Sequence, residues 1–292
     1  GCKGMLDDTD AAYSAAIAAF NEALGTDTEY ADAMAGAALA HTLQGSDWIA
    51  TGQALLKSAQ VPADERRALQ AAKAAGGKAA KEAAARLAEL EQGAATRRQE
   101  ALDALEKGGK LLGDGQVLLL KARRLGVESP FIAEAQAIWY TLDPEGAARA
   151  QEQLTHAVQL KQGTQATLSL TDPPDMWSPL IQGRIWSAPS LGNTARAVEA
   201  YRAALKHEPR LQRARWELAS LYVQEGQKDE AIKLLDAILA AVPTHEKAER
   251  LLSSLNHAQE KVVAAAESPS PKPTEPAGRH VAKGKRHRGK RK

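Results

Sequence analysis

Apolar residues recur at intervals of three and four positions along most of the chain, which is the spacing that gives an α-helix one buried face. Turns containing Gly or Pro separate these segments, and Gly76-Gly77 breaks the segment 62–92. The pattern predicts a series of helices rather than a sheet. In the middle of the chain the predicted helical segments are 62–92, 94–107, 115–125, 130–141 and 144–160.

A repeat of 34 residues stands out near the C-terminus. Small and large residues of the segment 197–209 recur 34 positions later, and the segment 214–243 has the pattern of a helix, a turn at Gly226, a second helix and Pro243. Small residues let paired helices approach closely, while large ones fill the space between neighbouring hairpins. The recurring residues are Ala197, Tyr201, Ala204 and Pro209, matched by Ala231, Leu235, Ile238 and Pro243.

This pattern resembles the tetratricopeptide repeat (TPR) family. The small and large positions of that family match at Leu218, Ala219, Tyr222, Gly226, Ala231 and Pro243. A second match covers residues 15–45, where Ala16, Phe20 and Ala23 occupy positions of a second repeat helix and Gly45 stands in the following first helix. The resemblance implies an all-α, right-handed TPR-like solenoid of antiparallel helix hairpins.

The chain divides into four predicted regions. Residues 1–5 are a tether or a cloning scar, and residues 6–192 form irregular TPR-like hairpins. Residues 193–264 hold the regular repeats and a capping helix, and residues 265–292 form a disordered tail rich in Pro, Ser and basic residues. Within the second region, Trp177, Ile181, Ile185 and Trp186 form one apolar stripe, which indicates either a core-facing helix or an inserted contact surface.

The tail carries most of the basic excess. The 292 residues have a formal charge of +2, yet residues 268–292 hold nine Lys and Arg against one acid. This segment would attract polyanions such as nucleic acid, anionic lipid or an acidic cell-wall polymer. No aromatic residue interleaves the cluster, so base stacking is not expected. The residues concerned are Lys283, Lys285, Arg286, Arg288, Lys290, Arg291 and Lys292.

Motifs that would support catalysis are missing from the sequence. One Cys excludes a multi-Cys zinc site, the seven His are scattered, and neither Gly-Gly-Lys segment has the remaining residues of a phosphate-binding loop. No apolar run reaches the length that a transmembrane helix needs. We therefore expect a protein that is not an enzyme, with no cofactor, no metal site and no small-molecule substrate.

The TPR resemblance implies a concave groove lined by the first helix of each hairpin, in which a protein or peptide partner would bind. The groove is expected to be a basic, hydroxyl-bearing strip with one Trp, which favours an acidic partner. An ordinary solvated face is the alternative interpretation. The groove positions are Arg213, Trp216, Ser220 and Val223 in one helix, and Lys247, Arg250, Ser254 and His257 in the capping helix.

The first two residues bear on the location of the protein. Gly1-Cys2 resembles the processed end of a bacterial lipoprotein, in which Cys2 would receive lipid. This predicts a scaffold anchored in the bacterial periplasm or outer membrane, within an envelope assembly, and otherwise a cytoplasmic one. Two further alternatives are a polyanion tether acting through the tail and a non-catalytic fragment of a larger signalling enzyme.

Overall fold

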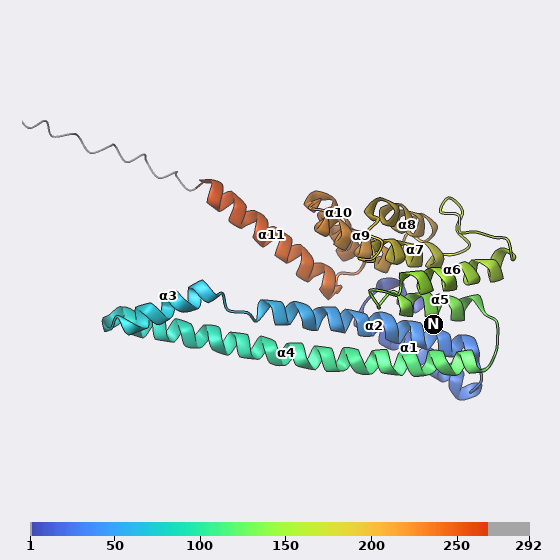
Figure 1. Cartoon of the computed structure of the whole chain (residues 1–292), viewed down its shortest axis with the longest axis horizontal. Helices are drawn as coiled ribbons and strands as arrows, with labels where there is room; N and C mark the ends of the chain where they lie inside the picture. The colour runs from blue at the N-terminus through green and yellow to red at the C-terminus, as the bar shows by residue number, and fades with distance from the viewer. Residues whose placement is uncertain (1, 268–292) are drawn as a thin grey trace, which may run out of the picture. The chain divides into compact units, whose positions relative to one another are not determined.

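The computed structural model describes residues 2–267, and every regular element in this range is helical (Figure 1). The predicted all-α, solenoid class is confirmed. The chain forms two compact units, Gly1–Leu252 and Ser253–Lys292. The elements are η1 (Cys2–Asp7), α1 (Asp10–Thr26), α2 (Ala31–Ser58), α3 (Ala63–Ala74), α4 (Gly77–Arg124), α5 (Pro130–Tyr140), α6 (Ala147–Gln162), α7 (Trp177–Ser187), α8 (Thr194–His207), α9 (Gln212–Gln224), α10 (Lys228–Ala241) and α11 (Glu246–Glu267).

The N-terminal hairpin consists of α1 and α2, which match the two helices expected over residues 15–45. Phe20 of α1 packs so closely on Gly36 of α2 that a Cβ atom there would lie 2.3 Å from the ring. The short helix η1 packs against α1, and its Met5 and Leu6 are buried. Met5, within the residues 1–5 predicted to be a tether or scar, thus belongs to the core, and the origin of this segment stays a prediction.

The longest elements, α2 and α4, lie side by side, and α3 also packs on α4 (Figure 1). The sequence places Gly45 within a helix, as observed in α2, but it predicts Gly-rich breaks between residues 107 and 115, where α4 continues without interruption. A Cβ at Gly45 would lie 3.0 Å from the Gly108 carbonyl oxygen, and one at Gly108 would lie 2.9 Å from the Gly45 carbonyl oxygen. These glycines allow the two helix backbones to approach rather than interrupting them.

The predicted helices 130–141 and 144–160 correspond to α5 and α6. Ser129 begins α5 as predicted, because its hydroxyl accepts a hydrogen bond of 3.2 Å from the Phe131 amide. In α7 the side chains of Trp177, Ile181 and Ile185 are buried. The apolar stripe of this helix is therefore a packing face, which decides between the two interpretations of that segment.

The repeat region is built from the hairpins α7–α8 and α9–α10, with α8 packed on α9. The small residues Ala204, Ala219 and Ala231 are fully buried at the helix contacts. Gly226 has a φ of +74° between α9 and α10, in the left-handed region that favours glycine. The hairpins expected from the 34-residue repeat are thus present.

The helix predicted over about 245–264 is α11, which runs to Glu267, and its role as a cap of the repeats stays a prediction. The predicted disordered tail, 265–292, therefore begins three residues too early. Its remaining residues lie outside the described part of the chain.

Candidate functional site

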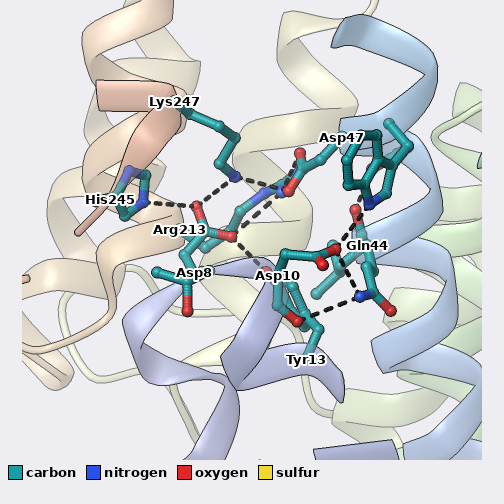
Figure 2. A network of polar contacts seen from close by, with 12 residues as sticks. Asp8, Asp10, Tyr13, Gln44, Asp47, Arg213, His245 and Lys247 are labelled. Carbon is teal, nitrogen blue, oxygen red and sulfur yellow. Dashed lines mark hydrogen bonds and ion pairs between the residues drawn. The ribbon is translucent and has the colours of Figure 1, made fainter. Parts of the chain in front are cut away.

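A buried cluster of opposite charges joins the N-terminal segment to the repeat region within the first unit (Figure 2). Asp8 precedes α1, Asp47 lies on α2, Arg213 on α9 and Lys247 at the start of α11. Lys247 Nζ lies 2.8 Å from Asp8 Oδ2 and 2.7 Å from Asp47 Oδ2. Arg213 Nη1 lies 3.3 Å from Asp8 Oδ1 and 2.7 Å from Asp47 Oδ1. Two cations and two carboxylates therefore alternate in one network.

Asp8 is held in place by the start of α1. Its φ of 53° lies in the left-handed region, which Asp tolerates better than most residues, and the hydroxyl of Thr9 then caps the helix. The Asp8 side chain is fully buried, and the Tyr13 hydroxyl donates a hydrogen bond to it. Burial acts to raise the pKa of Asp8, but Lys247 and Arg213 outweigh it and hold that pKa well below its usual value.

Arg213 connects this cluster to a second set of charges. Its side chain is only 5% exposed, and its Nε donates to Glu217 Oε1 over 2.8 Å. Glu217 also pairs with Arg184 of α7 at 3.0 Å. Burial acts to lower the pKa of Arg213, but the carboxylates of Asp47 and Asp8 raise it well above its usual value. Arg213 therefore stays charged and links three helices with the N-terminal segment.

A cleft of about 230 Å³ adjoins the cluster. It lies between the start of α1, the middle of α2 and the turn from α10 into α11. Trp48 stands at this cleft, where its indole Nε1 donates to Asp10 Oδ1 over 2.7 Å and Lys107 Nζ lies 3.8 Å from the ring centre. The cleft is lined by Asp8, Thr9, Asp10, Ala11, Tyr13, Gln44, Asp47, Trp48, Thr51, Thr244, His245, Glu246, Lys247 and Arg250.

A further buried polar cluster joins α5, α6 and the segment before α7. Lys161 Nζ lies 2.5 Å from Glu134 Oε1 and also pairs with Asp175, whose carboxylate accepts hydrogen bonds from the Trp177 and Ser178 amides. Burial and the neighbouring Asp175 raise the pKa of Glu134 to about 8. The cleft beside Trp48 does not include this cluster, so we interpret the cluster as a structural contact.

The structure brings some of the predicted groove residues together and separates others. Arg213 and Lys247 meet in a network with Asp8 and Asp47, and Lys247 Nζ also lies 5.4 Å from the ring centre of Trp216. Arg213 is buried and paired with carboxylates of this chain, and its predicted role in contacting a partner stays a prediction. Lys247 and Arg250 line the cleft, whereas Trp216, Ser220 and Val223 on α9 do not. Ser254 and His257 belong to the second unit, so their predicted place in a common groove stays a prediction.

The lining of the cleft differs in charge from the basic strip predicted for the groove. The cleft lining has Lys247 and Arg250 as its cations, and four carboxylates stand beside them. Asp8 and Asp47 are not among the site residues predicted from the sequence. The run Asp7-Asp8-Thr9-Asp10 reads as a charged helix start, and nothing local indicates that Asp8 pairs with a residue 205 positions away.

Other predicted sites are not tested by this structure. Residues 268–292 lie outside the described part of the chain, so the polyanion role of the tail stays a prediction. Cys2 begins η1, and its side chain is not described. Among residues 3–257, whose side chains the structure describes, no group of three His, Cys, Asp or Glu is placed to hold a metal ion. Over the same range no helix combines the length and apolarity that membrane crossing requires.

Comparisons with known proteins give one family. Residues 190–255, which include α8, α9, α10 and the start of α11, match the model of the tetratricopeptide repeat. No curated protein matches the sequence. Among solved structures the chain is similar to yeast Tom70, with 15% sequence identity and a TM-score of 0.39, over 88% of this chain and 61% of the Tom70 chain.

Proposed function

We propose that this protein, whose residues 190–255 are tetratricopeptide repeats, is a non-enzymatic scaffold that holds a segment of a partner protein in the cleft beside Trp48. Repeats of this family imply a protein or peptide partner. The observation that carries the proposal is the position of the cleft, which is lined both by the N-terminal hairpin and by the turn that follows the last repeat helix.

The size of the cleft defines what enters it. A cavity of about 150 Å³ is enough to hold a benzene molecule. The cleft, at about 230 Å³, therefore has room for one large side chain but not for a folded element. We infer that a partner inserts a single anchoring side chain and lays its backbone across the rim, where Trp48 and Arg250 stand.

The charges of the cleft define the anchor. Asp8 and Asp47 already neutralise Lys247, and the side chain of Arg250 pairs with Glu246 at 3.3 Å. An acidic anchor would meet no surplus of positive charge there. We therefore propose an uncharged anchor packed against the indole of Trp48, in place of the acidic partner that the sequence favours.

The test selects peptides of about 12 residues from a displayed random library on the full chain and measures their affinity by fluorescence polarisation. We expect Trp48→Ala to weaken the selected peptides by about 30-fold, the loss typical of a central aromatic contact of about 2 kcal/mol. Lys228→Glu, an exposed change outside the cleft lining, is the matched control and should leave the affinity unchanged.

Trp216→Ala separates this cleft from the groove expected on α9. If Trp216→Ala abolishes peptide binding while Trp48→Ala leaves it intact, the cleft is not the binding site. Selection of no binding peptide, with the folded state verified by circular dichroism, would contradict the proposal as a whole. A bacterial envelope setting and lipidation at Cys2 add to the proposal without being required by it.

A further inference from the structure

The outer face of α4 carries large apolar side chains that no other element in the described part of the chain covers. Leu102, Val117 and Leu120 are 55%, 52% and 44% exposed. Gly109 and Gly113 lie between them, and a Cβ atom at either position would meet nothing within 4 Å. With 3.6 residues per turn, these five positions fall within about 80° of the helix circumference. They form one continuous stripe, which we call the outer stripe.

The outer stripe faces away from the packing of α4 on α2. Ala101, Gly108 and Leu119 are buried on the α2 side. Glycine in an exposed helix interior destabilises the helix relative to alanine, and exposed leucine gains nothing from burial. Both features are explained if another helix packs on the stripe, since glycine lets a second backbone approach closely.

Four of the five positions of the outer stripe, all but Val117, are symmetric about residue 111, which points to a second copy of the chain as the occupant. Leu102 and Leu120 stand nine residues on either side of that position, and Gly109 and Gly113 stand two residues on either side. In an antiparallel pair, Leu102 therefore faces Leu120 of the second copy, and Gly109 faces Gly113. A two-fold interface presents the same surface from both copies, as this arrangement requires.

The charges along one edge of the stripe are complementary in the same register. Asp103, Lys110, Asp114 and Lys121 are all exposed and share this edge. An antiparallel copy places Asp103 opposite Lys121 and Lys110 opposite Asp114, each within about 3 Å along the axis. A parallel two-fold pair would instead place this edge against the opposite edge of the second copy, so these four charges would not meet.

We propose that the protein self-associates through the outer stripe of α4 as an antiparallel two-fold dimer. Arg98 and Arg124 stand thirteen residues on either side of position 111 and repel across the pair, so the contact ends before them. The stripe from Leu102 to Leu120 is about 27 Å long. One helix face of this length buries less than a standard interface, so we expect a dissociation constant on the order of 10 µM.

The first test is sedimentation equilibrium of the full chain over concentrations bracketing about 10 µM. Leu120→Glu places a charge in the interface and should weaken association at least about tenfold. Leu191→Glu, at a similarly exposed apolar residue in the loop before α8, is the matched control and should leave it unchanged. A monomer at every concentration overturns the proposal, as does equal weakening by both variants.

Charge exchange tests the register. Asp103→Lys alone should weaken the dimer about threefold, and adding Lys121→Asp in the same chain should restore it. Restoration is specific to an interface in which these two residues face each other. If the double variant is weaker than the single one, the register is wrong and the proposal fails.

Disulfide formation tests the orientation. In a Cys2→Ser background, Gly109→Cys and Gly113→Cys chains are mixed in equal amounts and oxidised. A close antiparallel crossing places these two Cα atoms within disulfide range, so a mixed disulfide dimer is expected. Glu100→Cys, exposed outside the outer stripe, is the control and should not cross-link. Homodimers of Gly109→Cys chains without the mixed product indicate a parallel pair and overturn the proposal.

Discussion

Arg213 offers the sharpest test of the buried charge cluster. It is surrounded by the carboxylates of Asp8, Asp47 and Glu217, and its side chain is almost fully buried. Replacing it by Met keeps much of the volume and removes the charge. Lys247 then remains as the one full cation beside both Asp8 and Asp47, so a carboxylate is left buried without a full partner.

The expected loss follows from that geometry. Removing one partner of a buried ion pair costs about 3–5 kcal/mol, because the remaining charge has lost its water without compensation. In a unit of this size that corresponds to a fall in Tm on the order of 10 °C. The measurement is urea unfolding of the full chain followed by circular dichroism, with the free energy of unfolding extrapolated to water.

A double-mutant cycle identifies the partner. Asp8→Asn with Arg213→Met removes both charges, so the loss should be smaller than the sum of the single losses by about 2 kcal/mol. Lys233→Met breaks an exposed pair with Glu230 of similar length and should cause no measurable loss. Two results would refute the cluster: a loss of less than about 1 kcal/mol in the free energy of unfolding for Arg213→Met, or no coupling in the cycle. Either would mean that Asp8 is not bound to Arg213 in solution.

Three other predictions concern stability. The pKa of Glu134 is raised to about 8, so the folded state retains a proton that the unfolded state loses near pH 4.5. The contribution of Glu134 to the free energy of unfolding therefore falls as the pH rises from about 4.5 to about 8. Subtracting the Tm profile of Glu134→Gln from that of the wild type should reveal that fall, and a flat difference contradicts it. Gly108→Val should lower the free energy of unfolding, measured in urea, by about 2–3 kcal/mol, since the valine side chain would press on the α2 backbone. The control Gly93→Ala has ordinary space around its Cβ and should be neutral or stabilising by up to about 1 kcal/mol. Gly226→Ala should cost about 1–2 kcal/mol because of its positive φ, and an unchanged Tm would show that the turn adopts another conformation.

The sequence alone predicts which segments are helical over most of this chain and where the repeat hairpins turn. The positions of Ala219, Ala231 and Gly226 are informative because a helix face and a tight turn depend on neighbours within a few residues. The 34-residue spacing extends that local information to the stacking of hairpins, since each hairpin presents the same apolar face to the next.

The same local signals failed where a residue's role depends on a distant backbone. Gly108 resembles a helix break in sequence, yet together with Gly45 it allows α2 and α4 to pack closely, because glycine permits both a turn and a close contact. Likewise Asp8 reads as a solvated helix start, and only the tertiary structure buries it against Arg213, 205 residues away. Charge pairing over that distance leaves no pattern in the chain, so the candidate cleft and its charge balance were decided by the fold.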